Sequence, residues 1–184
     1  SMQLVFTLNK VENETRALKS MLERGVDGVI AEPTKSGLPN PNIELYRQLA
    51  ERQIPVIFFN AYYPGLALPH VALDDKAAGK VATQRLIRAG HRKIAAIFQS
   101  DDLQGHLRYA GYLEALMENG IDMNANRVLW FATEDLASLF VDETRILRRM
   151  EGASAVICYN DQVALRLLAV LAKISGLMAP TITK

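Results

Sequence analysis

The chain has 184 residues, and its 21 basic and 20 acidic side chains leave a net charge of +1, without the basic excess of a free-standing nucleic-acid-binding domain. Hydrophobic residues make up 49% of the sequence, enough for a substantial core, yet no apolar run approaches the ~18 residues that span a membrane. A single cysteine, Cys158, excludes an intrachain disulfide, and its apolar neighbours indicate a buried strand residue. No basic segment followed by an apolar run opens the chain, so we expect a cytoplasmic protein.

The first half of the chain alternates short apolar runs with segments of helical periodicity. In the first such segment, Leu18, Met21 and Leu22 are spaced three or four residues apart, and Gly25 follows as a helix-ending residue. We predict helices at 12–24, 43–52 and 74–90, and strands at 4–6, 26–31, 56–59 and 71–73. Asp74 or Asp75 can cap the third helix.

The second half repeats the same alternation. We predict strands at 93–98, 127–131 and 153–159, and helices at 104–119, 138–150 and 161–174, the last closed by Gly176. Strands that alternate with helices through short connections predict an α/β fold with parallel, doubly wound sheets. Periodicity leaves open whether the strands form one large sheet or two smaller sheets that separate at 99–105.

Polar side chains follow the carboxyl ends of several predicted strands, which is where ligands bind in open α/β sheets. They are Glu32, Thr34, Lys35, Ser36, Asn60, Tyr62, Tyr63, Asp74, Asp75, Gln99, Asp101, Asp102, Gln104, Arg108, Asn160, Asp161 and Gln162. Carboxylates, amides and cations each bind sugar hydroxyls, and aromatic rings cover the apolar faces of a sugar. Together these residues predict a carbohydrate site.

Each of these residues also has a purely structural interpretation. Asp74 and Asp161 can cap helices, the pair Asp101 and Asp102 can form a solvated turn, and Tyr62 can pack at a rim. The three histidines lie in separate segments without metal-ligand spacing, and no glycine-rich phosphate loop follows a strand. We therefore expect no metal, no cofactor and no enzymatic activity. An α/β enzyme acting on pentoses is the alternative that turnover assays would reveal.

Three blocks of the sequence resemble the effector-binding domains of the lac repressor family. The first combines residues 73–75 with Gly79 and the pair Gly90 and His91, the second is the Arg-x-x-Gly-aromatic segment 108–112, and the third is 158–165. The resemblance implies a periplasmic-binding-protein-like type I fold with two doubly wound parallel-sheet lobes.

The same resemblance implies the domain organisation. We expect a first, partial lobe at 3–92 and a second lobe at 93–176, with 177–184 as a tail that returns after an absent segment. The first strand and helix of the first lobe, and the family's Gly-Tyr-Asp-Asp segment, have no counterpart here. We therefore expect the fold to be incomplete at the N-terminus and near the C-terminus.

A narrower resemblance is to the arabinose repressors of Gram-positive bacteria, which join a winged-helix DNA-binding domain of the GntR type to a lac-repressor-like sensor. It rests on segments 32–36, 41–46, 60–63, 101–105 and 158–161. The resemblance implies a homodimer that senses L-arabinose by lobe closure and releases operator DNA, which it contacts through a domain absent from this chain. We expect no membrane partner. The alternative is a solute-binding protein of a sugar transporter, which would bind sugar without a DNA partner.

The resemblance also assigns ligand-binding roles. Arg108 would grip sugar hydroxyls, Asn160 would form the pocket floor, and Asp74 or Asp75 would supply the acid of the first lobe. Glu32 and Lys35 would belong to the arabinose-specific part of the pocket. The complete predicted ligand-binding set is Glu32, Lys35, Tyr62, Asp74, Asp75, Asp101, Gln104, Arg108 and Asn160.

Overall fold

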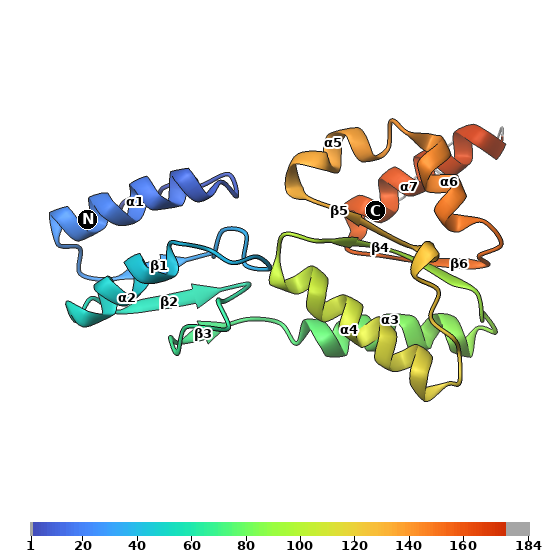
Figure 1. The fold of residues 1–184 in the computed structure, drawn as a ribbon, viewed down its shortest axis with the longest axis horizontal. Coiled ribbons are helices and arrows are strands. Elements are labelled where there is room, and N and C mark those ends of the chain that lie inside the picture. The colour runs from blue at the N-terminus through green and yellow to red at the C-terminus, as the bar shows by residue number, and fades with distance from the viewer. Residues whose placement is uncertain (1, 176–184) are drawn as a thin grey trace. The chain divides into compact units, whose positions relative to one another are not determined.

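The chain forms two compact units in the computed structural model, which describes residues 2–175 (Figure 1). Unit 1 comprises the residues up to Asp75 together with Asp101–His106, and unit 2 comprises Lys76–Ser100 and the residues from Leu107 onwards. The division falls at Asp75, whereas the sequence predicts it after residue 92. Gly176 and the predicted tail 177–184 lie outside the described residues.

Unit 1 contains a three-stranded parallel sheet and two helices. Its elements are α1 (Val11–Arg24), β1 (Val29–Ala31), α2 (Ile43–Glu51), β2 (Val56–Phe59) and β3 (His70–Val71). The strand order is β1-β2-β3, with Val29 opposite Val56 and Phe58 opposite His70. Helix α1 ends as predicted, because Gly25 takes a left-handed φ of 67° and donates its N–H to the carbonyl of Met21.

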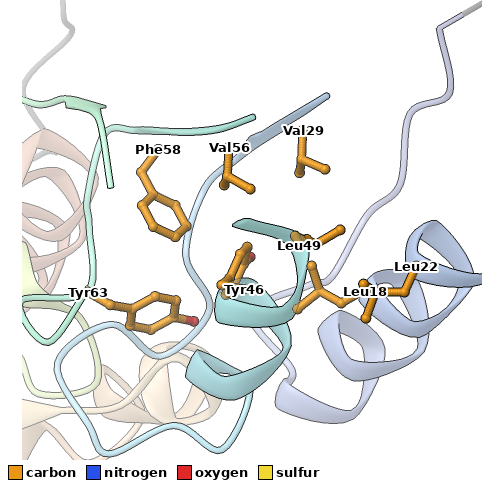
Figure 2. Packing of buried hydrophobic residues seen from close by; sticks show 8 residues of the cluster. All are labelled: Leu18, Leu22, Val29, Tyr46, Leu49, Val56, Phe58 and Tyr63. Carbon is orange, nitrogen blue, oxygen red and sulfur yellow. The ribbon is translucent and has the colours of Figure 1, made fainter. Parts of the chain in front are cut away.

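One face of this sheet packs against both helices (Figure 2). Tyr46 of α2 packs edge-on against Phe58 of β2, with ring centroids 4.9 Å apart. The helical spacing of Leu18 and Leu22 and the alternation along β1 and β2 direct the apolar side chains to this common side. The cluster consists of Leu18, Leu22, Val29, Tyr46, Leu49, Val56, Phe58 and Tyr63.

The opposite face of the unit 1 sheet is apolar and exposed. Because side chains alternate along a strand, the residues between the buried ones point to this second face. They are Ile30, Ile57, Phe59 and Val71, with exposed fractions of 76%, 42%, 44% and 73%. Parallel sheets in α/β proteins are ordinarily covered on both faces, so this surface is unusual for the fold.

The predicted strand at 4–6 is wrong. Within the described residues, the segment before α1 has no regular structure, and β1 pairs on one side with β2. Leu4 and Phe6 are each 72% exposed. A short apolar run forms a strand only when its backbone finds a hydrogen-bonding neighbour, and this segment has none within a sheet.

Unit 2 holds a second three-stranded parallel sheet, in the order β5-β4-β6. The structure therefore has two small sheets, which decides between the alternatives that periodicity leaves open. The elements of unit 2 are α3 (Asp75–Arg88), β4 (Ile94–Gln99), α4 (Leu103–Glu118), β5 (Val128–Phe131), α5 (Leu136–Leu139), α6 (Glu143–Met150), β6 (Ala155–Cys158) and α7 (Asp161–Ser175), with 3-10 turns at Ala125–Arg127 and Thr133–Asp135. The first turn of α4 is grouped with unit 1.

Helices cover both faces of the unit 2 sheet, as Figure 1 shows. The central strand β4 is buried from Ile94 to Phe98, and its residues alternate between two cores. Ile94, Ala96 and Phe98 pack on the side of α3 and α4, whereas Ile97 packs with residues of α5, α6 and α7. This layering explains why β4 reads as a continuous apolar run in the sequence.

The predicted single helix at 138–150 is also wrong, because α5 and α6 are separate. Helix α5 ends at Leu139, and α6 begins at Glu143. The carboxylate of Asp142 accepts a hydrogen bond from the N–H of Arg145, which caps α6 and interrupts the helical path.

Candidate functional site

Lys35 and Asp101 form a largely buried ion pair at the strand ends of unit 1. The Nζ of Lys35 lies 2.6 Å from Oδ2 of Asp101, and the two side chains are 15% and 1% exposed. The Nδ2 of Asn9 donates to the same carboxylate oxygen, and the backbone N–H of Lys35 donates to Oδ1 of Asn9. The interpretation of Asp101 as part of a solvated turn is therefore wrong.

The turn that carries Asp101 packs directly on the loop that carries Lys35. Ser36 accepts a hydrogen bond at Oγ from the N–H of Leu103, and a Cβ at Gly37 would lie only 2.6 Å from the carbonyl oxygen of Asp102. The carboxylate of Asp102 accepts from the N–H of Gly105 and caps the first turn of α4. Gln104, on that turn, is buried.

A buried carboxylate, Glu14, anchors the same loop from the other side. The N–H of Thr34 donates to Oε1 of Glu14 at 3.2 Å, and the carbonyl of Thr34 accepts from the hydroxyl of Tyr63 at 2.7 Å. Asn42 donates to Oε2 of Glu14 at 2.7 Å, and Tyr46 donates to Oε1 at 2.8 Å. Hydrogen bonds from these donors compensate the carboxylate for its loss of water.

Burial, reinforced by the charge of Glu14, raises the pKa of Tyr46 and that of Tyr63 far above the ordinary value. Both hydroxyls therefore remain protonated donors to the carboxylate. Glu14 is not among the residues predicted from the sequence, although a signal exists: it lies four residues before Leu18 and eight before Leu22, within the apolar stripe of α1.

The remaining predicted residues of unit 1 are distributed along the ends of its strands. Glu32 accepts a hydrogen bond from Nδ2 of Asn60 at 2.5 Å, and Tyr62 stacks on the ring of His70 with centroids 4.0 Å apart. Asp75 is buried where α3 begins, whereas Asp74 is exposed.

A cavity of about 440 Å³ lies beside Glu32 in unit 1. Residues 3–9, α1 and β1 line it, and most of the lining side chains are apolar. Asn9 and Glu32 are among its polar members. The cavity therefore reaches the polar strand ends from the side of the irregular N-terminal segment.

In unit 2, Arg108 reaches from α4 to the carboxyl end of β6. Its guanidinium donates to the carbonyl of Tyr159 and lies over the Tyr159 ring, with Cζ 4.9 Å from the centroid. Arg108 therefore binds the residue that precedes Asn160, and the structure brings these two predicted ligand-binding residues to the same strand end. The backbone N–H of Tyr159 donates to the carbonyl of Ile97.

Asn160 caps α7, a role that the sequence suggests for Asp161. Oδ1 of Asn160 accepts from the N–H of Val163 at 2.9 Å, which is the N-cap geometry. The exposed carboxylate of Asp161 accepts from the N–H of Gln162. Cys158, at the end of β6, has its pKa raised to about 11 by burial, which favours the inert thiol over a nucleophile.

Within residues 2–175, no three His, Cys, Asp or Glu side chains are grouped so that they could hold a metal ion. None of the helices in this described part combines the length and apolar character of a membrane span. In the two units taken together, the side chains at the carboxyl ends of the strands are hydrogen-bonding groups: amides, carboxylates, one lysine and one arginine.

Two curated relatives are similar along almost the whole chain. The arabinose metabolism transcriptional repressor of Halalkalibacterium halodurans is 40% identical over 167 residues, covering 90% of this chain and 44% of the relative. The repressor of the same name from Geobacillus stearothermophilus is 37% identical over 180 residues, covering 96% and 49%. The chain thus spans less than half the length of these relatives.

The fold is similar to that of solved regulators. The crystal structure of the transcription regulator CcpA of Lactococcus lactis superposes with a TM-score of 0.75 and 26% identity, covering 98% of this chain and 64% of that protein. The family model of periplasmic binding proteins and the sugar-binding domain of the LacI family matches residues 2–182. The chain therefore belongs to this family, as a LacI-type sugar-binding domain with the periplasmic-binding-protein-like fold.

Proposed function

We propose that the chain is the effector-binding part of a bacterial transcriptional repressor and that its effector is L-arabinose or a similar sugar. The observation that carries this proposal is the 40% identity over 90% of the chain to a protein named as an arabinose metabolism repressor. A second repressor of that name, at 37% identity, supports it independently.

The polar groups at the strand ends supply suitable chemistry for a sugar. In unit 1, Lys35 and Asp101 combine a cation and a carboxylate, and Glu32 adds a second acid. In unit 2, Arg108 offers several N–H donors, and Asn160 adds an amide at the same strand end. A pentose presents hydroxyls that both donate and accept, so such mixed groups match it.

In the proposed mechanism, one sugar binds groups of both units and favours an arrangement in which both contact it. A ligand shifts a conformational equilibrium only by the difference in its affinity for the two states. A coupling free energy of about 1–3 kcal/mol is typical of such switches and would suffice to lower the affinity for operator DNA. We also propose that the longer protein acts as a homodimer in the cytoplasm, where its operator lies.

Isothermal titration calorimetry with L-arabinose and a panel of other pentoses and hexoses tests the proposal on this chain. We expect saturable binding to L-arabinose or a close relative, and recovery of the sugar unchanged after incubation. Failure of every sugar in the panel to bind would overturn the sensor function, and conversion of the sugar would indicate an enzyme.

Operator release requires the full-length protein. We expect the sugar that binds most tightly to dissociate that protein from its operator fragment in a mobility-shift assay. Sugar binding without any DNA binding by the full-length protein would instead indicate a solute-binding protein.

A further inference from the structure

Helices α3 and α4 of unit 2 meet at two glycines that allow their backbones to touch. A Cβ at Gly79 would overlap the carbonyl oxygen of Arg108 and would lie 2.7 Å from its Cα. A Cβ at Gly111 would overlap the carbonyl oxygen of Lys76 and would lie 2.6 Å from the backbone nitrogen of Lys80. Real Cβ atoms do not approach backbone this closely, so either substitution must move the helices.

The residue that Gly79 contacts is the arginine that reaches β6. The Arg108 backbone is held against Gly79, while its side chain donates to the carbonyl of Tyr159 and covers the Tyr159 ring. A shift of α4 away from α3 would therefore displace the base of a side chain whose far end is fixed by two contacts. The guanidinium cannot keep both contacts unless its side chain changes rotamer.

A group of ion pairs ties the same two helices together at their surface. Glu114 of α4 lies 2.5 Å from Nζ of both Lys76 and Lys80, and Glu118 lies 2.6 Å from Nζ of Lys80. These bonds to the two lysines lower the pKa of Glu114 to about 2, so its carboxylate stays charged. Although exposed pairs are individually weak, this network favours the close approach that the glycines permit.

We propose that Gly79 is a positioning residue for sugar binding: the absence of a side chain there sets the place of Arg108 at the carboxyl end of β6. This inference rests on the proposed function, in which Arg108 binds the sugar. It goes beyond that function by assigning a role to a residue outside the predicted ligand-binding set. Gly79 acts through Arg108, and the ion pairs of Glu114 maintain the same helix crossing.

A double-mutant cycle measured by calorimetry with L-arabinose tests this role. We expect Gly79→Ala to weaken binding about tenfold to hundredfold, the range for a lost charge-assisted hydrogen bond. Because Gly79 acts through Arg108, the double variant Gly79→Ala/Arg108→Ala should bind no more weakly than Arg108→Ala alone. Val81→Ala, at an exposed position of the same helix, is the control and should bind like the unmodified chain.

Two outcomes of the cycle overturn the inference. One is an affinity of Gly79→Ala equal to that of the unmodified chain. The other is additive losses, which indicate that the substitution weakens binding by general loss of stability rather than through Arg108.

A ligand-free measurement separates this inference from the proposed function. In the NMR spectrum, the Tyr159 ring should shift the side-chain resonances of Arg108 away from those of an exposed arginine such as Arg85. We expect Gly79→Ala to abolish that shift, and an unchanged shift overturns the positioning role. If the unmodified chain binds no sugar, the proposed function fails while this measurement still decides where Gly79 places Arg108.

A second variant tests the same role in case Gly79→Ala does not fold. Glu114→Gln removes the ion pairs with both lysines without adding an atom at the crossing. We expect it to reduce the Arg108 shift partially, whereas Glu143→Gln, which removes the ion pair with Lys173 on α7, should leave it unchanged. Equal spectra for the two variants would contradict the role of the crossing.

Discussion

Lys35 and Asp101 lie 66 residues apart in the sequence, yet their side chains form an ion pair with a separation of 2.6 Å within unit 1. Lys35 takes a left-handed φ of 49°, an unusual conformation for a residue with a side chain. Asn9 and the N–H of Gly37 donate hydrogen bonds to Asp101, and Ser36 accepts one from the N–H of Leu103, so the two segments are held together. The ion pair therefore depends on a loop whose conformation is fixed by hydrogen bonds.

Replacing Asp101 with Asn should destabilise the chain by about 1–3 kcal/mol, because the largely buried ammonium of Lys35 would lose its charged partner. Urea unfolding measures this loss. Glu44→Gln is the control, since the Glu44–Arg47 pair is exposed on both sides and should contribute less than about 0.5 kcal/mol. Equal midpoints for the two variants would show that the Asp101 pair is no stronger than a surface pair.

Replacing Glu14 with Gln should cost about 2–4 kcal/mol, because the amide nitrogen would face groups that are themselves donors. Tyr46, Asn42 and the N–H of Thr34 would then compete for a single acceptor oxygen. Thermal unfolding should show a lower Tm. Glu12→Gln, at an exposed position of the same helix, is the matched control and should leave the Tm nearly unchanged; a similar Tm for both variants would refute the buried network.

The stability of the chain should fall as the pH rises from 10 to 12. Burial raises the pKa of Tyr112 from 10 to about 12, and its hydroxyl donates to the carbonyl of Ile94. In that window the unfolded chain loses the tyrosine proton while the folded chain retains it, so the free energy of unfolding decreases with increasing pH. Tyr46 and Tyr63 contribute in the same direction.

Denaturant unfolding at a series of alkaline pH values checks this expectation. The variant Tyr112→Phe should show a shallower decrease of stability between these pH values. Ultraviolet titration of the folded chain should show one late-ionising tyrosine fewer in Tyr112→Phe than in the unmodified chain. A decrease of the same slope in Tyr112→Phe would assign the alkaline instability to other groups.

Replacing Arg108 with Ala should weaken binding of L-arabinose about tenfold to hundredfold, with the fold retained. The side chain lies at the surface end of β6 rather than in a core, so circular dichroism should be unchanged. Arg85→Ala, at an exposed position of α3, is the control for loss of one positive charge. Unchanged affinity in Arg108→Ala, measured by calorimetry, would remove Arg108 from the proposed site.

Much of the fold could be predicted because its signals are local. The spacing of Leu18 and Leu22, the helix-ending Gly25 and the apolar run of β4 each concern neighbouring residues. The predictions that failed are those in which a local pattern needed a partner from a distant segment, or in which a second local signal opposed it. Residues 4–6 form a short apolar run like that of a strand but find no sheet neighbour, and Asp142 breaks a helix that apolar periodicity alone would continue.

For the candidate site, the sequence by itself determined which kinds of side chain follow the strands. A strand ends where its apolar run stops, so the polar residues that come next can be identified from the sequence. It determined neither the partners nor the burial of those side chains. The pairing of Lys35 with Asp101, the burial of Glu14 and the contact of Gly79 with Arg108 were decided only by the tertiary structure. The physical reason is that hydrogen bonds, ion pairs and close packing depend on distances between segments far apart in the chain, which periodicity does not encode.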